Sequence, residues 1–127
     1  MPVRTELSLR LPNSPGALAA VCAILGREGV GITALALEAG GQLRMIVDNH
    51  VRASGALREA RHKIVERDVL VISLSNGPGD LATVARLVAE SGVNVEYAYG
   101  GASESSGRAV AVLGVADPAR AAAAAGV

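Results

Sequence analysis

Aromatic side chains are almost absent from this sequence of 127 residues, which has two tyrosines and neither phenylalanine nor tryptophan. Hydrophobic residues nevertheless make up 50% of the chain, which is enough to form a core. That core must be built from Ala, Val, Leu and Ile, which pack as small units and favour thin, layered folds. The length suits one ordinary domain or two small ones.

Cysteine is also scarce, because Cys22 is the only one. No disulfide within the chain and no multi-cysteine metal site can therefore form. His50 and His62 lack the spaced partners of a metal site, so we expect no metal and no cofactor. Cys22 lies on the apolar stripe of a predicted helix, where a small core hydrophobe is expected rather than a nucleophile.

The sequence also has no excess of charge of one sign and no long apolar run. The 12 basic and 12 acidic residues cancel, whereas a nucleic-acid-binding domain normally presents a basic face. No apolar stretch approaches the roughly 20 residues that span a bilayer, and the opening MPVRTELSLRLP lacks the apolar core of a signal peptide. We expect a cytoplasmic protein that binds neither nucleic acid nor membrane. Because no catalytic triad or phosphate-loop motif is present, we do not expect an enzyme.

What the sequence does contain is an internal repeat. NSPGAL at residues 13–18 returns as NGPGDL at residues 76–81. Shifting the sequence by 63 residues superimposes these two stretches, and it also aligns Leu7 with Leu70 and Gly29 with Gly92 without a gap. The matching residues are those that local structure restricts most, so we interpret the chain as a duplication.

Each copy predicts the same series of elements, beginning with a strand at 5–11 or 69–74. Pro15 and Pro78 are placed to be the first residues of a helix, and Ser14 can act as an N-cap. Gly29 and Gly92 are expected at the left-handed ends of these helices. A hairpin and a second helix follow, at 30–37, 42–48 and 53–63 in the first copy and at 93–99, 108–115 and 117–124 in the second, with Asp48 or Asn49 and Asp117 as caps.

This order predicts an α+β fold in which each copy is a ferredoxin-like βαββαβ plait, an antiparallel sheet with both helices on one face. The first domain is expected at residues 1–67, ending in a short strand at 63–66, and the second at 68–127. The second copy lacks an evident last strand. Either its edge is truncated near Val127, or a strand from elsewhere fills that place.

The loop after each first strand resembles that of the ACT domain, a family of small-molecule sensors that regulate amino-acid metabolism. Asn-x-Pro-Gly-x-Leu, an apolar helix and Gly-Val-x-Ile follow one another at residues 11–32, and the second copy is similar at 74–95. The resemblance implies a stand-alone tandem of ACT domains without catalytic activity. It also implies an amino acid held in a seam between paired domains, a homodimer, and a regulated enzyme as a partner.

The two loops are the predicted ligand site. A helix N-terminus offers unpaired backbone N–H groups and the positive end of the helix dipole, which suit a carboxylate. Glycine permits close approach of a ligand, and asparagine offers both donors and an acceptor to an α-amino acid. The expected ligand-binding residues are Asn13, Ser14, Pro15, Gly16, Ala17, Leu18, Ile32, Asn76, Gly77, Pro78, Gly79, Asp80, Leu81 and Tyr97.

Other interpretations of these residues stay open. Asn-x-Pro-Gly also makes a good turn and cap, so the alternative function is a structural assembly or dimerisation module that has lost ligand binding. Asp80 suits the helix dipole but repels a carboxylate, although it could hold an ammonium group, so the two loops are not expected to be equivalent. Tyr97 and Tyr99 share one strand face, where packing competes with a role in lining the seam.

Overall fold

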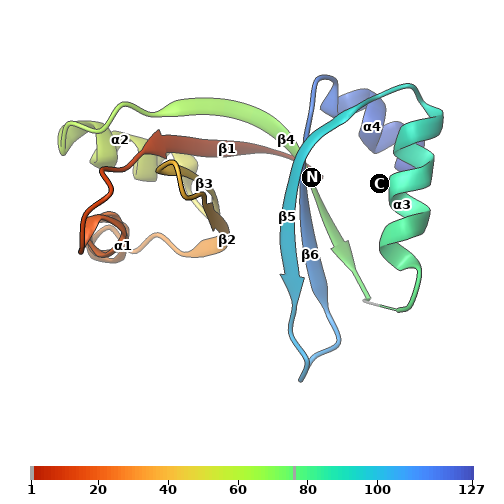
Figure 1. The fold of residues 1–127 in the computed structure, drawn as a ribbon, viewed down its shortest axis with the longest axis horizontal. Coiled ribbons are helices and arrows are strands. Elements are labelled where there is room, and N and C mark those ends of the chain that lie inside the picture. Colours follow the sequence, from red (N-terminus) through yellow and green to blue (C-terminus); the bar gives the residue numbers. More distant parts are fainter. Residues whose placement is uncertain (1, 76) are drawn as a thin grey trace. The chain divides into compact units, whose positions relative to one another are not determined.

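A computed structural model describes residues 2–75 and 77–127 (Figure 1). In these residues the elements run in the order β1 (Val3–Arg10), α1 (Ala17–Arg27), β2 (Ile32–Leu37), β3 (Gln42–Val47), α2 (His50–Glu59), β4 (Val65–Leu74), α3 (Asp80–Glu90), β5 (Val95–Ala102), β6 (Ala109–Val115) and α4 (Pro118–Ala125). The chain divides into two compact units. We call residues 5–67 the N-terminal unit, and residues 2–4 with 68–127 the C-terminal unit.

The N-terminal unit is a plait whose strands follow the order β2-β3-β1, with β4 next to β1. Leu43 of β3 pairs with both Leu9 and Leu37, so these three leucines share one face of the sheet. Helices α1 and α2 pack on that face through apolar residues spaced for a single stripe. Each fully buried leucine contributes about 1.5–3 kcal/mol to the stability of the folded state. The buried core of this unit consists of Leu7, Leu9, Leu11, Val21, Leu25, Val30, Leu43, Met45, Val47, Ala53 and Leu57.

The C-terminal unit repeats this plait with the order β4-β6-β5 and with α3 and α4 on one face (Figure 1). The place of its last strand is taken by the start of the chain. The backbone N–H of Val71 donates to the carbonyl of Pro2 at 2.7 Å, and Val3 packs against the core of this unit. Of the two alternatives for the missing strand, the structure shows a strand supplied from elsewhere.

Several local predictions are confirmed. The side chains of Asn49 and Asp117 accept hydrogen bonds from the backbone N–H groups three residues later, and so cap α2 and α4. Gly29 and Gly92 have φ angles of 69° and 80°. These left-handed angles end the helices as expected, because glycine adopts them without the penalty of a Cβ.

Several element boundaries differ from the predictions, most clearly in β4 and α2. The expected short strands at 63–66 and 69–74 form one strand, because β4 continues through Arg67 and Asp68. Pairing with neighbouring strands outweighs the low strand preference of such charged residues. Helix α2 begins at His50 rather than at 53, directly after its Asn49 cap. Among the described residues, no helix combines the length and the apolar character required to cross a bilayer.

Candidate functional site

The first Asn-x-Pro-Gly loop is a type II β-turn followed by a helix. The backbone N–H of Ala17 donates to the carbonyl of Ser14 at 3.3 Å, and Gly16 has φ 87° and ψ −5°. Proline at the second position and glycine at the third are the residues that this turn requires. The predictions that Pro15 begins the helix and that Ser14 caps it are therefore wrong. Helix α1 begins at Ala17, because the left-handed Gly16 cannot be part of it.

The second loop repeats this geometry. The backbone N–H of Asp80 donates to the carbonyl of Gly77 at 3.1 Å, and Gly79 has φ 85° and ψ −3°. Pro78 thus precedes α3 instead of beginning it, which corrects the second prediction of the same kind. No described atom lies within 4 Å of the point where a Cβ would stand on Gly16 or Gly79. Their backbone angle, and not a crowded surrounding, is what requires glycine in both loops.

A groove of about 390 Å³ lies beside the first loop, between the start of α1 and the β2–β3 turn. The two walls are joined by a hydrogen bond of 2.7 Å from the backbone N–H of Leu11 to the carbonyl of Gly41. Gly41 has φ 92°, and a Cβ there would overlap the Leu11 carbonyl, so glycine is needed for this close approach. We call this the first groove; its lining residues are Leu11, Pro12, Asn13, Ser14, Gly16, Ala17, Leu18, Ala19, Leu37, Glu38, Ala39 and Gly41.

The first groove has opposite charge preferences at its two walls. On one wall, no described side chain caps the N-terminus of α1 and its first turn has no acidic residue. The backbone N–H groups of Leu18 and Ala19 have no acceptor within the helix, because they belong to its first turn. On the other wall lies the carboxylate of Glu38, which forms an ion pair with Arg44. A zwitterion can therefore meet donors at one end and a carboxylate at the other.

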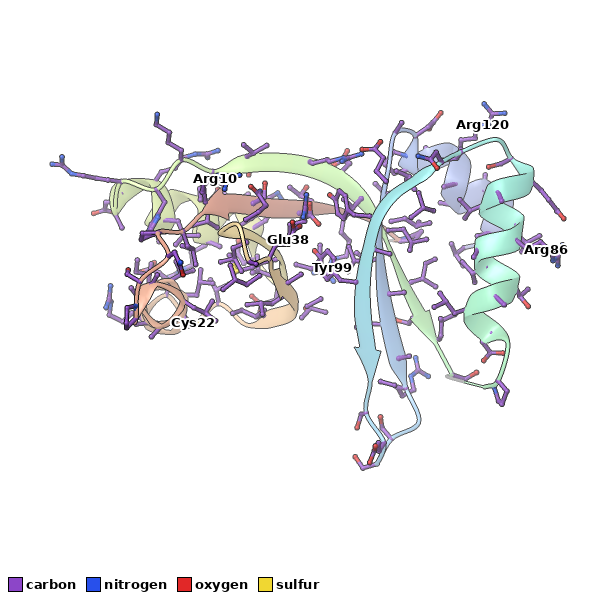
Figure 2. All side chains as sticks on the ribbon, in the orientation of Figure 1. Arg10, Cys22, Glu38, Arg86, Tyr99 and Arg120 are labelled. Carbon is purple, nitrogen blue, oxygen red and sulfur yellow. The ribbon has the colours of Figure 1, made fainter. Side chains whose placement is uncertain are left out.

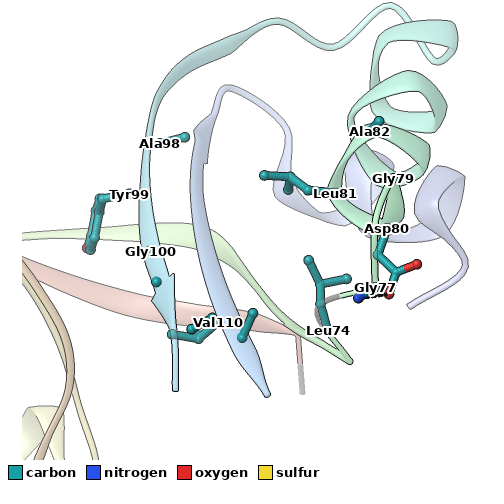
Figure 3. Close-up of a pocket in the computed structure, with 13 residues that line it drawn as sticks. Leu74, Gly77, Gly79, Asp80, Leu81, Ala82, Ala98, Tyr99, Gly100 and Val110 are labelled. Carbon is teal, nitrogen blue, oxygen red and sulfur yellow. Dashed lines mark hydrogen bonds between the residues drawn. The ribbon is translucent and has the colours of Figure 1, made fainter. Parts of the chain in front are cut away.

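A second groove of about 590 Å³ lies beside the second loop, between α3 and strand β5 (Figure 3). Its side chains are mostly small and apolar, and Leu74 and Leu81 project into it from β4 and α3 (Figure 3). We call this the second groove; its lining residues are Leu74, Gly77, Gly79, Asp80, Leu81, Ala82, Ala98, Tyr99, Gly100, Gly101, Ala102, Ala109 and Val110.

Asp80 makes the second groove electrostatically different from the first. Its Oδ2 atom accepts hydrogen bonds from the backbone N–H of Gly77 at 2.8 Å and from the hydroxyl of Ser75 at 3.0 Å. The carboxylate thus already lies at the positive end of α3 and uses one of the loop's donors. A second carboxylate would meet repulsion there, whereas the first loop has Ala17 at the matching position.

The structure brings most of the predicted ligand-binding residues to the two grooves. Asn13, Ser14, Gly16, Ala17 and Leu18 line the first, and Gly77, Gly79, Asp80 and Leu81 line the second. Of the described residues that were predicted, Pro15, Ile32, Pro78 and Tyr97 line neither groove. Asn76 lies outside the residues that the structure describes.

Glu38 is the charged lining residue of the first groove that the sequence analysis did not name. The antiparallel pairing of β1 with β3 matches Arg10 to Gln42, so the turn before Gln42 must lie at the end of β1. That is also where the Asn-x-Pro-Gly loop begins. The predicted plait topology was therefore a sufficient signal to place Glu38 beside the loop.

Tyr97 and Tyr99 stack on the face of the sheet that is turned away from α3. Their ring centroids are 6.5 Å apart with an interplanar angle of 9°. Figures 2 and 3 show Tyr99 pointing to the side of β5 opposite α3, the helix that carries Arg86 and Leu81. The ring of Tyr97 lies over Gly114, where a Cβ would overlap it. Tyr99 therefore lines the second groove from its place on β5 while its ring points to the opposite side of the strand.

The grooves offer hydrogen bonds and charge pairing as their chemistry. Each contains a single carboxylate, Glu38 or Asp80, and neither is lined by histidine or cysteine. Across residues 2–75 and 77–127, no group of three or more His, Cys, Asp and Glu side chains is close enough to hold a metal ion. A small polar molecule is thus the ligand class that these features suit.

Comparison with known proteins gives a family and a set of similar structures. The profile of a family described as the ACT domain pair matches residues 3–123. The crystal structure of protein BT0572 from Bacteroides thetaiotaomicron is 30% identical, with a TM-score of 0.87 over 97% of this chain and 86% of that one. No protein with curated information matches.

Two further structures share the fold at lower identity. The ligand-free regulatory subunit of aspartate kinase from Thermus thermophilus is 21% identical, with a TM-score of 0.72 over 99% of this chain and 91% of that one. Aspartokinase III of E. coli, in complex with lysine and aspartate, is 16% identical, with a TM-score of 0.63 over 94% of this chain and 29% of that one.

Proposed function

The chain belongs to the family of ACT domain pairs, and from this we propose that it is a non-catalytic regulatory protein that binds an amino acid. The observation that carries the proposal is the pairing of an uncapped helix N-terminus with the Glu38 carboxylate across the first groove. An aspartokinase with the same fold has been crystallised with lysine and aspartate, which supports the same ligand class.

In the first groove the ligand's carboxylate accepts from the amides of Leu18 and Ala19 and from the side chain of Asn13. Its ammonium group lies toward Glu38. Three or four such hydrogen bonds supply about 3–5 kcal/mol at about 1–1.5 kcal/mol each. This is the scale of a millimolar-to-micromolar sensor, about 4–8 kcal/mol in total.

The walls of the first groove favour an amino acid with a small or branched apolar side chain. Leu11 and Leu18 contribute to the loop wall and Leu37 to the hairpin wall. Glu38 is the only charged side chain among the described lining residues, and in this proposal the ligand's ammonium group uses it. Burial of two or three methylene groups against these leucines would add about 0.8 kcal/mol for each.

A second copy of the chain completes the regulatory unit in this proposal. Ile32, Leu35 and Leu37 are exposed on β2, the edge strand of the N-terminal unit. An exposed apolar edge strand is a surface that proteins usually cover, and a partner copy there would bring Ile32 into a seam. Ligand binding then favours one packing of the copies, with a coupling of about 1–3 kcal/mol to a regulated enzyme.

The test is a thermal-shift and calorimetric titration of unfolded-and-refolded protein with each common amino acid. We expect at least one to raise the melting temperature, and Asn13→Ala and Glu38→Gln to remove this response. Asn94→Ala, on an exposed loop of the C-terminal unit, is the matched control and should bind as the wild type does. If no amino acid shifts the melting temperature at millimolar concentration, the proposal fails.

A second candidate function is an assembly module without a ligand. The second loop favours it, because a carboxylate of the same chain already accepts a hydrogen bond from a backbone N–H of that loop. Asp80 shows that a loop of this type can be stabilised by its own chain. This candidate expects the oligomeric state to be the same for the wild type and Asn13→Ala. It also expects every amino acid to leave that state unchanged, which sedimentation at several protein concentrations measures.

A further inference from the structure

A third groove lies in the N-terminal unit and shares no lining residue with the first groove. It occupies about 470 Å³ where β1 ends, β3 begins and the chain passes from α2 to β4. Figure 2 shows Arg10 at this end of β1. The polar side chains that line the groove are those of Ser8, Arg10, Gln42, Arg61, His62 and Lys63.

The third groove concentrates positive charge in a protein whose net charge is zero. Arg10, Arg61 and Lys63 line it together with His62, and no acidic residue is among the described lining residues. In the part of the chain that the structure describes, none of these three cations lies within 4.0 Å of a carboxylate. The Nη1 atom of Arg10 donates a hydrogen bond to the carbonyl oxygen of Gly40 at 2.6 Å, which fixes the orientation of this side chain.

The backbone of Arg61 gives a second reason to assign a function to this groove. Arg61 has φ 72° and is the only non-glycine residue with a positive φ among those described. The N–H of Arg61 donates to the Arg58 carbonyl at 2.9 Å and that of His62 to the Leu57 carbonyl at 3.0 Å. This is the helix-ending motif whose left-handed residue is usually glycine. Arginine therefore stands at a position where glycine would be more stable.

We propose that the third groove binds a small molecule that carries two or more phosphate groups. Guanidinium groups match phosphate oxygens with paired hydrogen bonds, and lysine adds a compact point charge. Gln42 and Ser8 add neutral donors that orient the ligand. The volume lies within the roughly 300–1,000 Å³ range of small-molecule sites. This proposal is independent of amino-acid binding, since the two grooves have separate lining residues.

Inorganic pyrophosphate is the probe that tests this assignment on the full chain. Titration at constant ionic strength, followed by NMR, should shift the side-chain resonances of His62 and Gln42. We expect Arg61→Gly to weaken pyrophosphate binding at least about tenfold while its melting temperature stays equal to or above that of the wild type, because glycine accepts the left-handed angle. Arg10→Gln should weaken binding similarly, and Arg86→Gln in the C-terminal unit is the matched control.

Three results would overturn the proposal. One is the absence of saturable binding up to about 10 mM pyrophosphate, the range of a very weak site. Another is equal weakening by Arg86→Gln and Arg10→Gln, which would show only a general attraction to positive charge. The third is an unchanged affinity of Arg61→Gly for pyrophosphate, which would show that Arg61 only ends helix α2 and does not bind the ligand. None of these results bears on the response to amino acids.

Discussion

The carboxylate of Asp80 accepts a hydrogen bond from the backbone N–H of Gly77 at 2.8 Å. It thereby places an anion from within the chain at the N-terminus of α3, the position that a carboxylate ligand would favour. The first loop has Ala17 in the equivalent place and no acidic residue in the first turn of its helix. Two loops with nearly the same sequence and the same turn therefore differ in the charge that they present.

Replacing Asp80 by alanine should give the second loop the charge of the first. We expect Asp80→Ala to lower the free energy of unfolding by about 1–2 kcal/mol, because it removes two hydrogen bonds and a favourable dipole contact. The amino acid that binds the first groove should then also bind the second. Calorimetric stoichiometry measures this change from a single ligand per chain to two. Unchanged stoichiometry in a folded Asp80→Ala protein would contradict it.

The turn glycines should be sensitive to any side chain. Gly16→Ala and Gly79→Ala should each cost about 1–2 kcal/mol, because an L-residue is strained at φ near 87° or 85°. Gly26, inside α1 with open space around its Cβ position, is the matched control. Gly26→Ala should stabilise the protein by about 0.5–1 kcal/mol. Urea unfolding measures all three variants, and a loss of stability in Gly26→Ala equal to that in Gly16→Ala would count against backbone strain.

Gly114 should be required for the tyrosine stack. A Cβ at Gly114 would overlap the ring of Tyr97, so Gly114→Ala should displace this ring and cost about 1–3 kcal/mol. These two tyrosines are the only aromatic residues, and near-UV circular dichroism therefore reports on their stack directly. Gly101→Ala on β5, where nothing lies within 4 Å of the added atom, is the control and should leave the spectrum unchanged.

Val3 should stabilise the C-terminal unit although it lies near the first residue of the sequence. Its side chain packs against the core of that unit, so Val3→Ala should cost about 1 kcal/mol for a half-buried residue. Both tyrosines lie in the same unit, and their fluorescence during urea unfolding reports on it. Val65→Ala, which truncates an exposed valine of β4, is the comparison. Equal midpoints for Val3→Ala and the wild type would contradict this role.

Much of the fold could be predicted because its determinants are local and occur twice. The alternating strands, the apolar helix stripes and the caps Asn49 and Asp117 are each encoded within a few neighbouring residues. The repeat of Pro15-Gly16 as Pro78-Gly79 located both loops. Their exact turn was not predicted, because a proline before a helix suits both the first helical position and a type II turn. The φ of the glycine that follows separates the two cases.

What could not be predicted depends on contacts between distant parts of the chain. Nothing near Val71 indicates that the carbonyl of Pro2 will pair with it. The internal bonds of Asp80 were also missed, since its first-turn position indicates only a favourable charge and not the partners that it accepts from. Glu38 could have been placed, as the pairing of β1 with β3 already brings its turn to the loop.

The most direct test of amino-acid binding in the first groove is a ¹H–¹⁵N NMR titration of the wild-type chain with the best-binding amino acid. The account predicts saturable shifts in the backbone amides of Leu18 and Ala19 and in the side-chain amide of Asn13. The amides of Leu81 and Ala82, the matching positions of α3, should stay in place. Saturation that shifts only Leu81 and Ala82, or that leaves all of these amides unmoved, would contradict it.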